Sequence, residues 1–342
     1  MKQVARELGV RYVLEGSVRK AGNRVRITGQ LIDTGTGAHI WADRFDGALD
    51  DIFELQDQVA SGVVGAIEPR LRSAEIERAI RKPTDSLDAY DLYLRALALR
   101  DKHTDESVRE AISLLKQALA IDPDYAPAKA AIGWSCIRQR SHGRTPVLEA
   151  DAAEAVAFAR MTLEVGKDDP DTLWMAAATL ALLAGDHAVA GGAIDRALTL
   201  NPNSAHAWMA RGWVSGAAGQ PGEAIEAYEC AMRLSPLDSL RRTFTIGIAR
   251  AHMVAGRHEE ALDWADRTLR EEPGYRAALV TKAIVCAHLD RIEDARTALS
   301  LWIESQPAFT IARYGAIWSH AFSPELMAIS LTGLLKAGLL EE

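Results

Sequence analysis

The stretch HAWMARGWVSGAAGQPGEAIEAYECAMRLSP, residues 206–236, shows how most of this chain folds. Small and large residues occupy it at regular distances: Gly212 and Ala224 are small, whereas Trp208 and Tyr228 are large. From residue 87 onward the sequence has no strand signal and predicts helices of about 12–16 residues separated by short turns. We therefore interpret the stretch as two antiparallel helices, in which small residues let the backbones approach and large residues fill the gaps.

The same spacing recurs along the chain. Proline, or Lys167 in its place, falls at positions 123, 167, 202, 236, 273 and 307, in steps of 44, 35, 34, 37 and 34 residues. A small residue precedes each of them by twelve: Ala111, Ala155, Ala190, Ala224, Ala261 and Ala295. In the quoted stretch, six markers fall at positions 4, 8, 20, 24, 27 and 32 of a 34-residue unit: Trp208, Gly212, Ala224, Tyr228, Ala231 and Pro236.

This pattern resembles the tetratricopeptide repeat. The resemblance implies a mainly α-helical solenoid of about six helix pairs over residues 87–307, with the last helices capping it over residues 308–342. We interpret the step of 44 residues as an insert of ten around RQRSHGRTP, residues 138–146, which we expect to form a loop between helices.

Residues 1–82 have a different sequence pattern, part of which is typical of strands. Three segments alternate apolar and polar residues: RYVLEGSVRK (11–20), RVRITGQLID (24–33) and AHIWADRF (38–45). Turn signals separate them at residues 22–23 and 34–37, which predicts a three-stranded antiparallel meander. We expect a short helix at residues 2–8 and a long helix over residues 50–79, in which Pro69 could introduce a kink. These residues would form a small, incomplete α/β domain, joined to the helical part by a linker at 83–86.

The segment VARELGVRYVLEGSVRKAGNRVRITGQLIDTGTGAHIWADRFDGALDDIFELQDQVA, Val4–Ala60, closely resembles part of the TolB-like domain of bacterial proteins related to class III adenylate/guanylate cyclases. It also occurs in some winged-helix transcriptional regulators, and tetratricopeptide repeats follow it. The ending GLLKAGLLEE resembles their usual carboxyl terminus. The resemblance implies that a catalytic domain would lie upstream of Met1, so we expect a truncated product, a misplaced start or a split gene. It also implies a sheet edge that is open to pairing with another chain.

The composition is that of an ordinary soluble globular protein. The chain has 342 residues and a net charge of −8, which argues against nucleic acid as a general partner. We find no signal peptide and no run of 18 apolar residues, so we expect no membrane partner. The three cysteines, Cys136, Cys230 and Cys286, lie far apart among apolar residues, as buried thiols of a reducing compartment do. We therefore expect a cytoplasmic protein.

The repeat resemblance also implies a concave groove, lined by the first helix of each pair. Positions 2, 5, 9 and 12 of that helix normally face the groove. The groove residues that we expect on this basis are mostly apolar, with His206 and Arg250 as polar exceptions: Trp134, Met175, Leu182, His206, Met209, Trp213, Ile246, Arg250, Met253, Val280 and Ile284. They favour a protein or peptide partner that offers an apolar or helical segment.

Alternatives stay open at this point. The same side chains could be covered by the last helix of the chain itself, or pack against the second helix of each pair. The function that we predict is a non-catalytic interaction scaffold in signalling. The alternative is the regulatory portion of a nucleotide cyclase or of a winged-helix regulator.

Catalytic constellations are missing from the sequence. It contains no GxxxxGK[ST], no GxGxxG after a strand, no HExxH and no GxSxG. We therefore expect no catalytic residue, no cofactor and no metal ion, and no enzyme activity in this chain.

Overall fold

The computed structural model describes residues 9–81, 87–100, 104–142, 149–236, 238, 240–304, 309–319 and 321–341. The helix expected at residues 2–8, the linker expected at 83–86 and the repeat marker Pro307 lie outside the described residues. The chain divides into two compact units, Met1–Ser86 and Leu87–Glu342. Each unit is described by itself.

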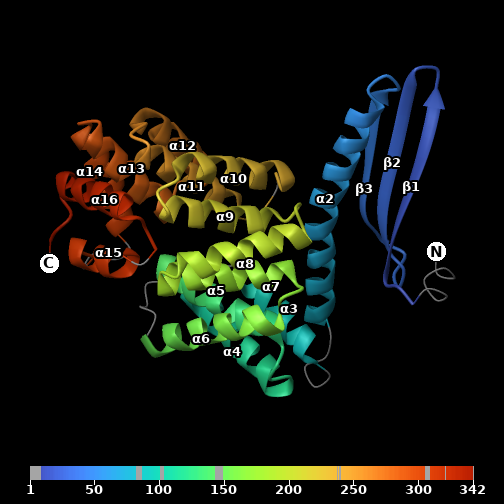
Figure 1. Cartoon of the computed structure of the whole chain (residues 1–342), viewed down its shortest axis with the longest axis horizontal. Coiled ribbons are helices and arrows are strands. Elements are labelled where there is room, and N and C mark those ends of the chain that lie inside the picture. Colours follow the sequence, from blue (N-terminus) through green and yellow to red (C-terminus); the bar gives the residue numbers. More distant parts are fainter. Residues whose placement is uncertain are drawn as a thin grey trace. The chain divides into compact units, whose positions relative to one another are not determined.

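The first unit contains a three-stranded antiparallel sheet, as the alternating segments predict (Figure 1). The strands are β1 (Tyr12–Ala21), β2 (Arg24–Asp33) and β3 (His39–Ala48), in the order β1-β2-β3. Gly22, in the turn between β1 and β2, has a φ of 61°, which a glycine adopts without strain. The helix α2 (Ile52–Arg81) packs against β3 and β2, and it continues through position 69 without a break.

The two faces of the sheet differ in polarity. On the face that α2 covers, the ring of Trp41 crosses Gly29, where an added Cβ would lie 2.9 Å from the ring carbons. Leu31 is buried beside them. The opposite face carries polar pairs, such as the ion pair between Arg26 and Asp46 at 2.6 Å. This alternation fixes the register, because a slip by one residue would expose the apolar face.

A buried carboxylate ties α2 to the first strand. Glu75 accepts hydrogen bonds from Arg11 (2.6 Å), from the Tyr12 hydroxyl (2.5 Å) and from Arg78 (3.1 Å). Burial alone would raise the pKa of Glu75, but these hydrogen bonds outweigh it and lower the pKa. The carboxylate thus stays charged and joins α2 to the start of β1.

The second unit is a solenoid of six helix pairs in the described part of the chain (Figure 1). The fold predicted from the repeats is therefore correct. The pairs are α3 (Ala89–Arg100) with α4 (Asp105–Ile121), α5 (Ala126–His142) with α6 (Glu149–Val165), α7 (Pro170–Thr179) with α8 (His187–Leu200), α9 (Ala205–Ala217) with α10 (Pro221–Leu234), α11 (Arg241–Val254) with α12 (His258–Glu271), and α13 (Arg276–His288) with α14 (Ile292–Ile303).

The regular small residues are packing sites. All six alanines that precede the repeat ends are buried: Ala111, Ala155, Ala190, Ala224, Ala261 and Ala295. The ring of Tyr228 lies between two glycines, Gly212 of its own pair and Gly247 of the next pair. A Cβ added to Gly212 would lie 2.6 Å from the ring, and one added to Gly247 would also overlap it. Thr179 fills the space over Gly133 in a similar way.

Two local features depart from the regular repeat. The helix α5 runs on to His142, so the first half of the insert 138–146 extends a helix, and the expectation of a loop there is wrong for residues 138–142. The extension has a tertiary contact, because Arg140 Nη1 donates to Leu182 O at 3.2 Å in the next pair. After α7, the residues Leu180–Ala184 form one π-helical turn, which Gly185 ends with a φ of 69°.

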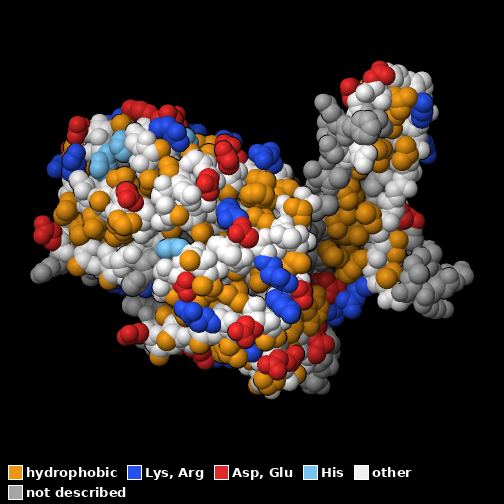
Figure 2. Space-filling model, viewed as in Figure 1, with side chains coloured by type: hydrophobic (Ala, Val, Ile, Leu, Met, Phe, Trp, Pro, Cys, Tyr) orange, Lys and Arg blue, Asp and Glu red, His pale blue; other side chains and the backbone are white. Residues whose placement is uncertain are grey.

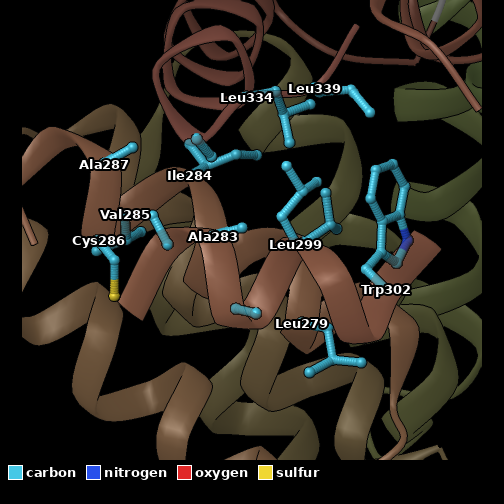
Figure 3. Close-up of a cluster of buried hydrophobic side chains, with 14 of the residues drawn as sticks. Leu279, Ala283, Ile284, Val285, Cys286, Ala287, Leu299, Trp302, Leu334 and Leu339 are labelled. Carbon is cyan, nitrogen blue, oxygen red and sulfur yellow. The ribbon is translucent and has the colours of Figure 1, made fainter. Parts of the chain in front are cut away.

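The last helices pack onto the end of the solenoid. They are α15 (Ile311–Trp318) and α16 (Pro324–Ala337), and the Ser323 hydroxyl caps α16 by accepting from Leu326 N–H at 3.2 Å. Figure 3 shows Leu334 above Ile284, beside Leu299 of α14. A Cβ on Gly333 would lie 2.8 Å from the Ile284 side chain, so α16 touches α13 closely. His288 Nε2 lies 2.9 Å from Ile329 O and ties the same two helices.

Candidate functional site

The concave side of the solenoid holds a cavity of about 730 Å³. Its lining comes from α5 and α6, from the π-helical turn, from α9 to α11, from α13 and the end of α14, and from the segment that contains α15 and the start of α16. Elsewhere the solenoid surface that Figure 2 shows is a mixture of apolar, acidic and basic side chains. The cavity is distinguished by its lining, which includes nine aromatic side chains and five arginines.

Aromatic side chains form two groups in this cavity. Trp134 of α5 and Trp213 of α9 lie 5.5 Å apart between ring centroids. Trp318, the last residue of α15, stacks on Phe322, which precedes α16, at 5.0 Å with an interplanar angle of 4°. Trp134 is buried, whereas the other three rings are partly exposed and offer apolar surface to a ligand.

Trp134 also carries an unsatisfied donor. Its indole Nε1 is buried and has no hydrogen-bond partner among the described residues. Leaving such a donor unpaired costs about 1–3 kcal/mol. An acceptor brought to this part of the cavity would recover part of that cost.

Arginines give the cavity a positive charge. Glu149 is the only carboxylate among the described lining residues. Five arginines line the cavity: Arg138, Arg140, Arg250, Arg276 and Arg313. The guanidinium of Arg250 lies 5.2 Å from the Phe322 ring centroid, and that of Arg313 lies 5.4 Å from the Phe309 ring centroid. The whole chain has a net charge of −8, so the arginines concentrate positive charge locally.

Arg140 is partly buried at the cavity wall. Its Nη1 donates to Leu182 O at 3.2 Å. Burial lowers the pKa of Arg140, and no opposite charge compensates for the desolvation. In the described part of the chain, Arg140, Arg250 and Arg313 form no ion pair with a carboxylate. A bound anionic group would therefore meet cations that have no counter-ion.

Six of the eleven groove residues that the sequence predicts line this cavity: Trp134, Leu182, Trp213, Ile246, Arg250 and Val280. They come from α5, the π-helical turn, α9, α11 and α13. The structure therefore brings together residues that lie about 150 positions apart in the chain (134 to 280).

The other five do not line the cavity: Met175, His206, Met209, Met253 and Ile284. Met175 and Met209 are buried, because the first helices of adjacent pairs, α7 and α9, pack directly on each other. Met253 and Ile284 belong to the apolar cluster that includes Leu334 of α16. A partner cannot reach these four side chains in this conformation.

His206 has a structural environment. Its ring stacks on Trp174 at 5.2 Å, and its Nε2 lies 3.4 Å from Asp238 Oδ2. Burial alone would raise the pKa of Asp238, but the hydrogen bonds from His206, from Leu240 N–H and from Ser235 outweigh it and lower the pKa. The pair joins α9 to the turn before α11.

Several cavity residues escaped the sequence analysis. Arg140 lies in the insert for which the sequence predicts a loop, and Arg313, Trp318 and Phe322 lie beyond the last repeat. The repeat pattern carries no information on either segment. The run of aromatic residues in FTIARYGAIWSHAF, residues 309–322, was the one available signal that this segment covers an apolar surface.

Nucleophiles and metal ligands do not gather in the described part of the chain. No group of three or more His, Cys, Asp or Glu side chains there could hold a metal ion. The cysteines are free thiols, and burial raises the pKa of Cys136 to about 12 and that of Cys286 to about 11. Such thiols are poor nucleophiles at neutral pH.

No described helix combines the length and the apolar character that crossing a bilayer requires.

Comparison with known proteins defines the class first. The tetratricopeptide repeat family matches residues 175–239, 210–275 and 246–308. Residues 175–308 therefore carry tetratricopeptide repeats, and the helix pairs before them continue the same solenoid.

Among individual proteins, the chain is similar to "Putative adenylate cyclase 3" of Rhizobium meliloti (strain 1021). The two are 38% identical over 173 residues, which is 50% of this chain and 29% of the relative. The chain thus matches less than a third of that relative's length.

Two solved structures are similar to this chain, and the first of them shows the similarity of fold. The "APC/C hetero-tetramer Cut9-Hcn1" has a TM-score of 0.53 at 13% identity, over 82% of this chain and 49% of that one. A second structure is "YrrB: a TPR protein with an unusual peptide-binding site", with a TM-score of 0.35 at 20% identity, over 60% of this chain and 95% of that one.

Proposed function

We propose that this chain is a non-catalytic protein-interaction module, which holds an apolar or helical segment of a partner protein in the concave cavity of its solenoid. The observation that carries the proposal is the cavity of about 730 Å³ with its partly exposed rings. A helix packed into an apolar groove is a common mode of peptide recognition. The chain itself contains an example of such packing, because α16 seats on α13 through Leu334 and Gly333.

The test is a selection of random peptides of about 16 residues, roughly four to five helical turns, on the full chain. Enriched peptides are then titrated against Trp213→Ala, which removes a cavity ring, and against Trp264→Ala. Trp264 is also partly exposed but lies outside the cavity, so its variant is the matched control. Binding that is lost only with Trp213→Ala supports the proposal. Equal losses in both variants, or no enriched peptide, contradict it.

A second surface favours self-association through the sheet. Thr34 N–H donates to Arg11 O at 2.9 Å, so odd-numbered residues of β1 direct their backbone groups to β2. The backbone groups of Gly16 and its even-numbered neighbours therefore point to the open edge. Leu14 and Val18 on this edge have exposed fractions of 52% and 69%. Antiparallel pairing of two copies about Gly16 would place Leu14 of each opposite Val18 of the other.

The similarity to the cyclase-related protein supports a regulatory setting. We propose that residues 1–82 form a partial TolB-like domain, that residues 87–307 form the repeat solenoid after a linker at 83–86, and that residues 308–342 cap it. On this view the chain is a regulatory portion of a nucleotide cyclase system and makes no cyclic nucleotide itself. Incubation of the full chain with ATP or GTP and a divalent cation should yield no cyclic product.

We also propose a cytoplasmic location. The free thiols of Cys136, Cys230 and Cys286 support it, because thiols stay reduced in that compartment. Cell fractionation with an antibody against the chain tests this proposal.

A further inference from the structure

The charge of the cavity narrows the choice of partner. Five arginines against one carboxylate make its lining strongly positive, although the chain as a whole is acidic. A basic or neutral segment would leave Arg140, Arg250 and Arg313 without counter-ions, and binding would desolvate them further. A segment with carboxylates would supply those counter-ions inside a partly water-excluded site, where charge pairs are stronger than in bulk water.

The aromatic rings define the rest of the partner. Arg250 lies over Phe322, and Trp318 stacks on the same ring, so cation and apolar surface lie side by side. A side chain that packs on Trp318 would thus bring its neighbours in the sequence close to Arg250. The unsatisfied Nε1 of Trp134 adds a hydrogen-bond donor that suits an oxygen acceptor.

The position of α16 indicates where such a segment would lie. Leu326, in the first turn of α16, lines the cavity, and the rest of the helix packs on α13 and α14. The cavity therefore begins at the first turn of α16. A second helical segment that enters there would continue the same apolar surface toward α5 and α9.

We propose that the partner segment is an acidic amphipathic helix, whose apolar face packs on Trp213 and Trp318 and whose carboxylates pair with Arg140 and Arg250. This inference rests on the proposed function, since it names the chemistry of the segment that the same cavity takes. The helix is recognised by its combination of bulky apolar side chains at three- and four-residue spacing with Asp or Glu between them.

The experiment uses the peptides that the selection above enriches. We expect them to carry a net negative charge. Their affinity for the full chain should fall on the order of tenfold for each of Arg140→Glu and Arg250→Glu, because the substitution removes one attractive charge and adds a repulsive one. It should also fall as the salt concentration rises. Arg109→Glu is the control, because Arg109 is exposed on α4 outside the cavity.

Three further variants keep the test decisive. The conservative Arg140→Lys and Arg250→Lys retain the charge and should retain most of the affinity, even if the acidic variants perturb the fold. The double variant Arg140→Glu/Arg250→Glu should prefer a version of the peptide in which Lys replaces its acidic residues. That reversal requires a direct charge contact.

The outcomes separate the two proposals. The inference is overturned, and the proposed function stands, if the enriched peptides depend on Trp213 but are neutral or basic. The same holds if they bind Arg140→Glu and Arg250→Glu as tightly as the wild type. No peptide that depends on Trp213 overturns the proposed function and the inference with it.

Discussion

Substituting Gly247 by alanine would place a methyl group against the ring of Tyr228. The ring is buried, and Gly212 closes its other side, where a Cβ would lie only 2.6 Å away. It therefore has no room to withdraw. Overpacking of this kind costs about 1–3 kcal/mol, and alanine returns about 1 kcal/mol through its higher helix propensity. Because the overlap is severe, we expect the upper part of that range and a net loss of about 2 kcal/mol.

Chemical unfolding of the full chain, followed by circular dichroism, measures this loss. The control is Gly192→Ala in α8, where a Cβ would meet nothing within 4 Å. That variant should gain up to about 1 kcal/mol from helix propensity alone. Combining Gly247→Ala with Tyr228→Ala should remove the penalty of the first substitution, since the ring it meets is gone. If both glycine variants change stability in the same direction, the packing argument is refuted.

Three further tests address other contacts. Asp238→Asn should be less stable than the wild type near neutral pH, and the gap should narrow as pH falls below about 4, because a lowered pKa gives stability that acid removes; melting temperatures across pH check it, and a constant gap contradicts it. Glu75→Gln should lower the free energy of unfolding by about 2 kcal/mol, because it weakens charged hydrogen bonds. Amide hydrogen exchange in β1 should be faster in this variant than in the wild type; slower exchange would oppose the prediction. Gly16→Cys should form an intermolecular disulfide in a Cys230→Ser background, whereas Val18→Cys should not, because the paired Cα atoms would lie about 5.5 Å apart at position 16 and about 13 Å apart at 18; equal crosslinking, or none, rejects the register.

Periodic features were predictable from the sequence. The alternation in residues 11–45 predicted the strand order, and the spaced alanines predicted the helix pairs. Six of the groove residues that the repeat resemblance implied line the cavity. Both signals arise because the same environment recurs every two residues along a strand and every 34 residues along the repeats.

The seating of α16 and the extension of α5 could not be predicted in this way. Each depends on a single tertiary contact, such as Gly333 against Ile284, for which one sequence shows no period. The same limit explains why Met175 and Met209, which share a repeat position with cavity residues, are buried instead.

The ring held between Gly212 and Gly247 also restricts how this array could be recombined. A consensus repeat can be moved along an array because the interfaces between its repeats are all alike. Here the interfaces differ: Tyr228 packs between two glycines at one of them, and Thr179 packs over Gly133 at another. A chimera that imports residues 205–236 without Gly247 would meet a side chain where the ring must go. The side chains at these interfaces thus determine which helix pair can follow which.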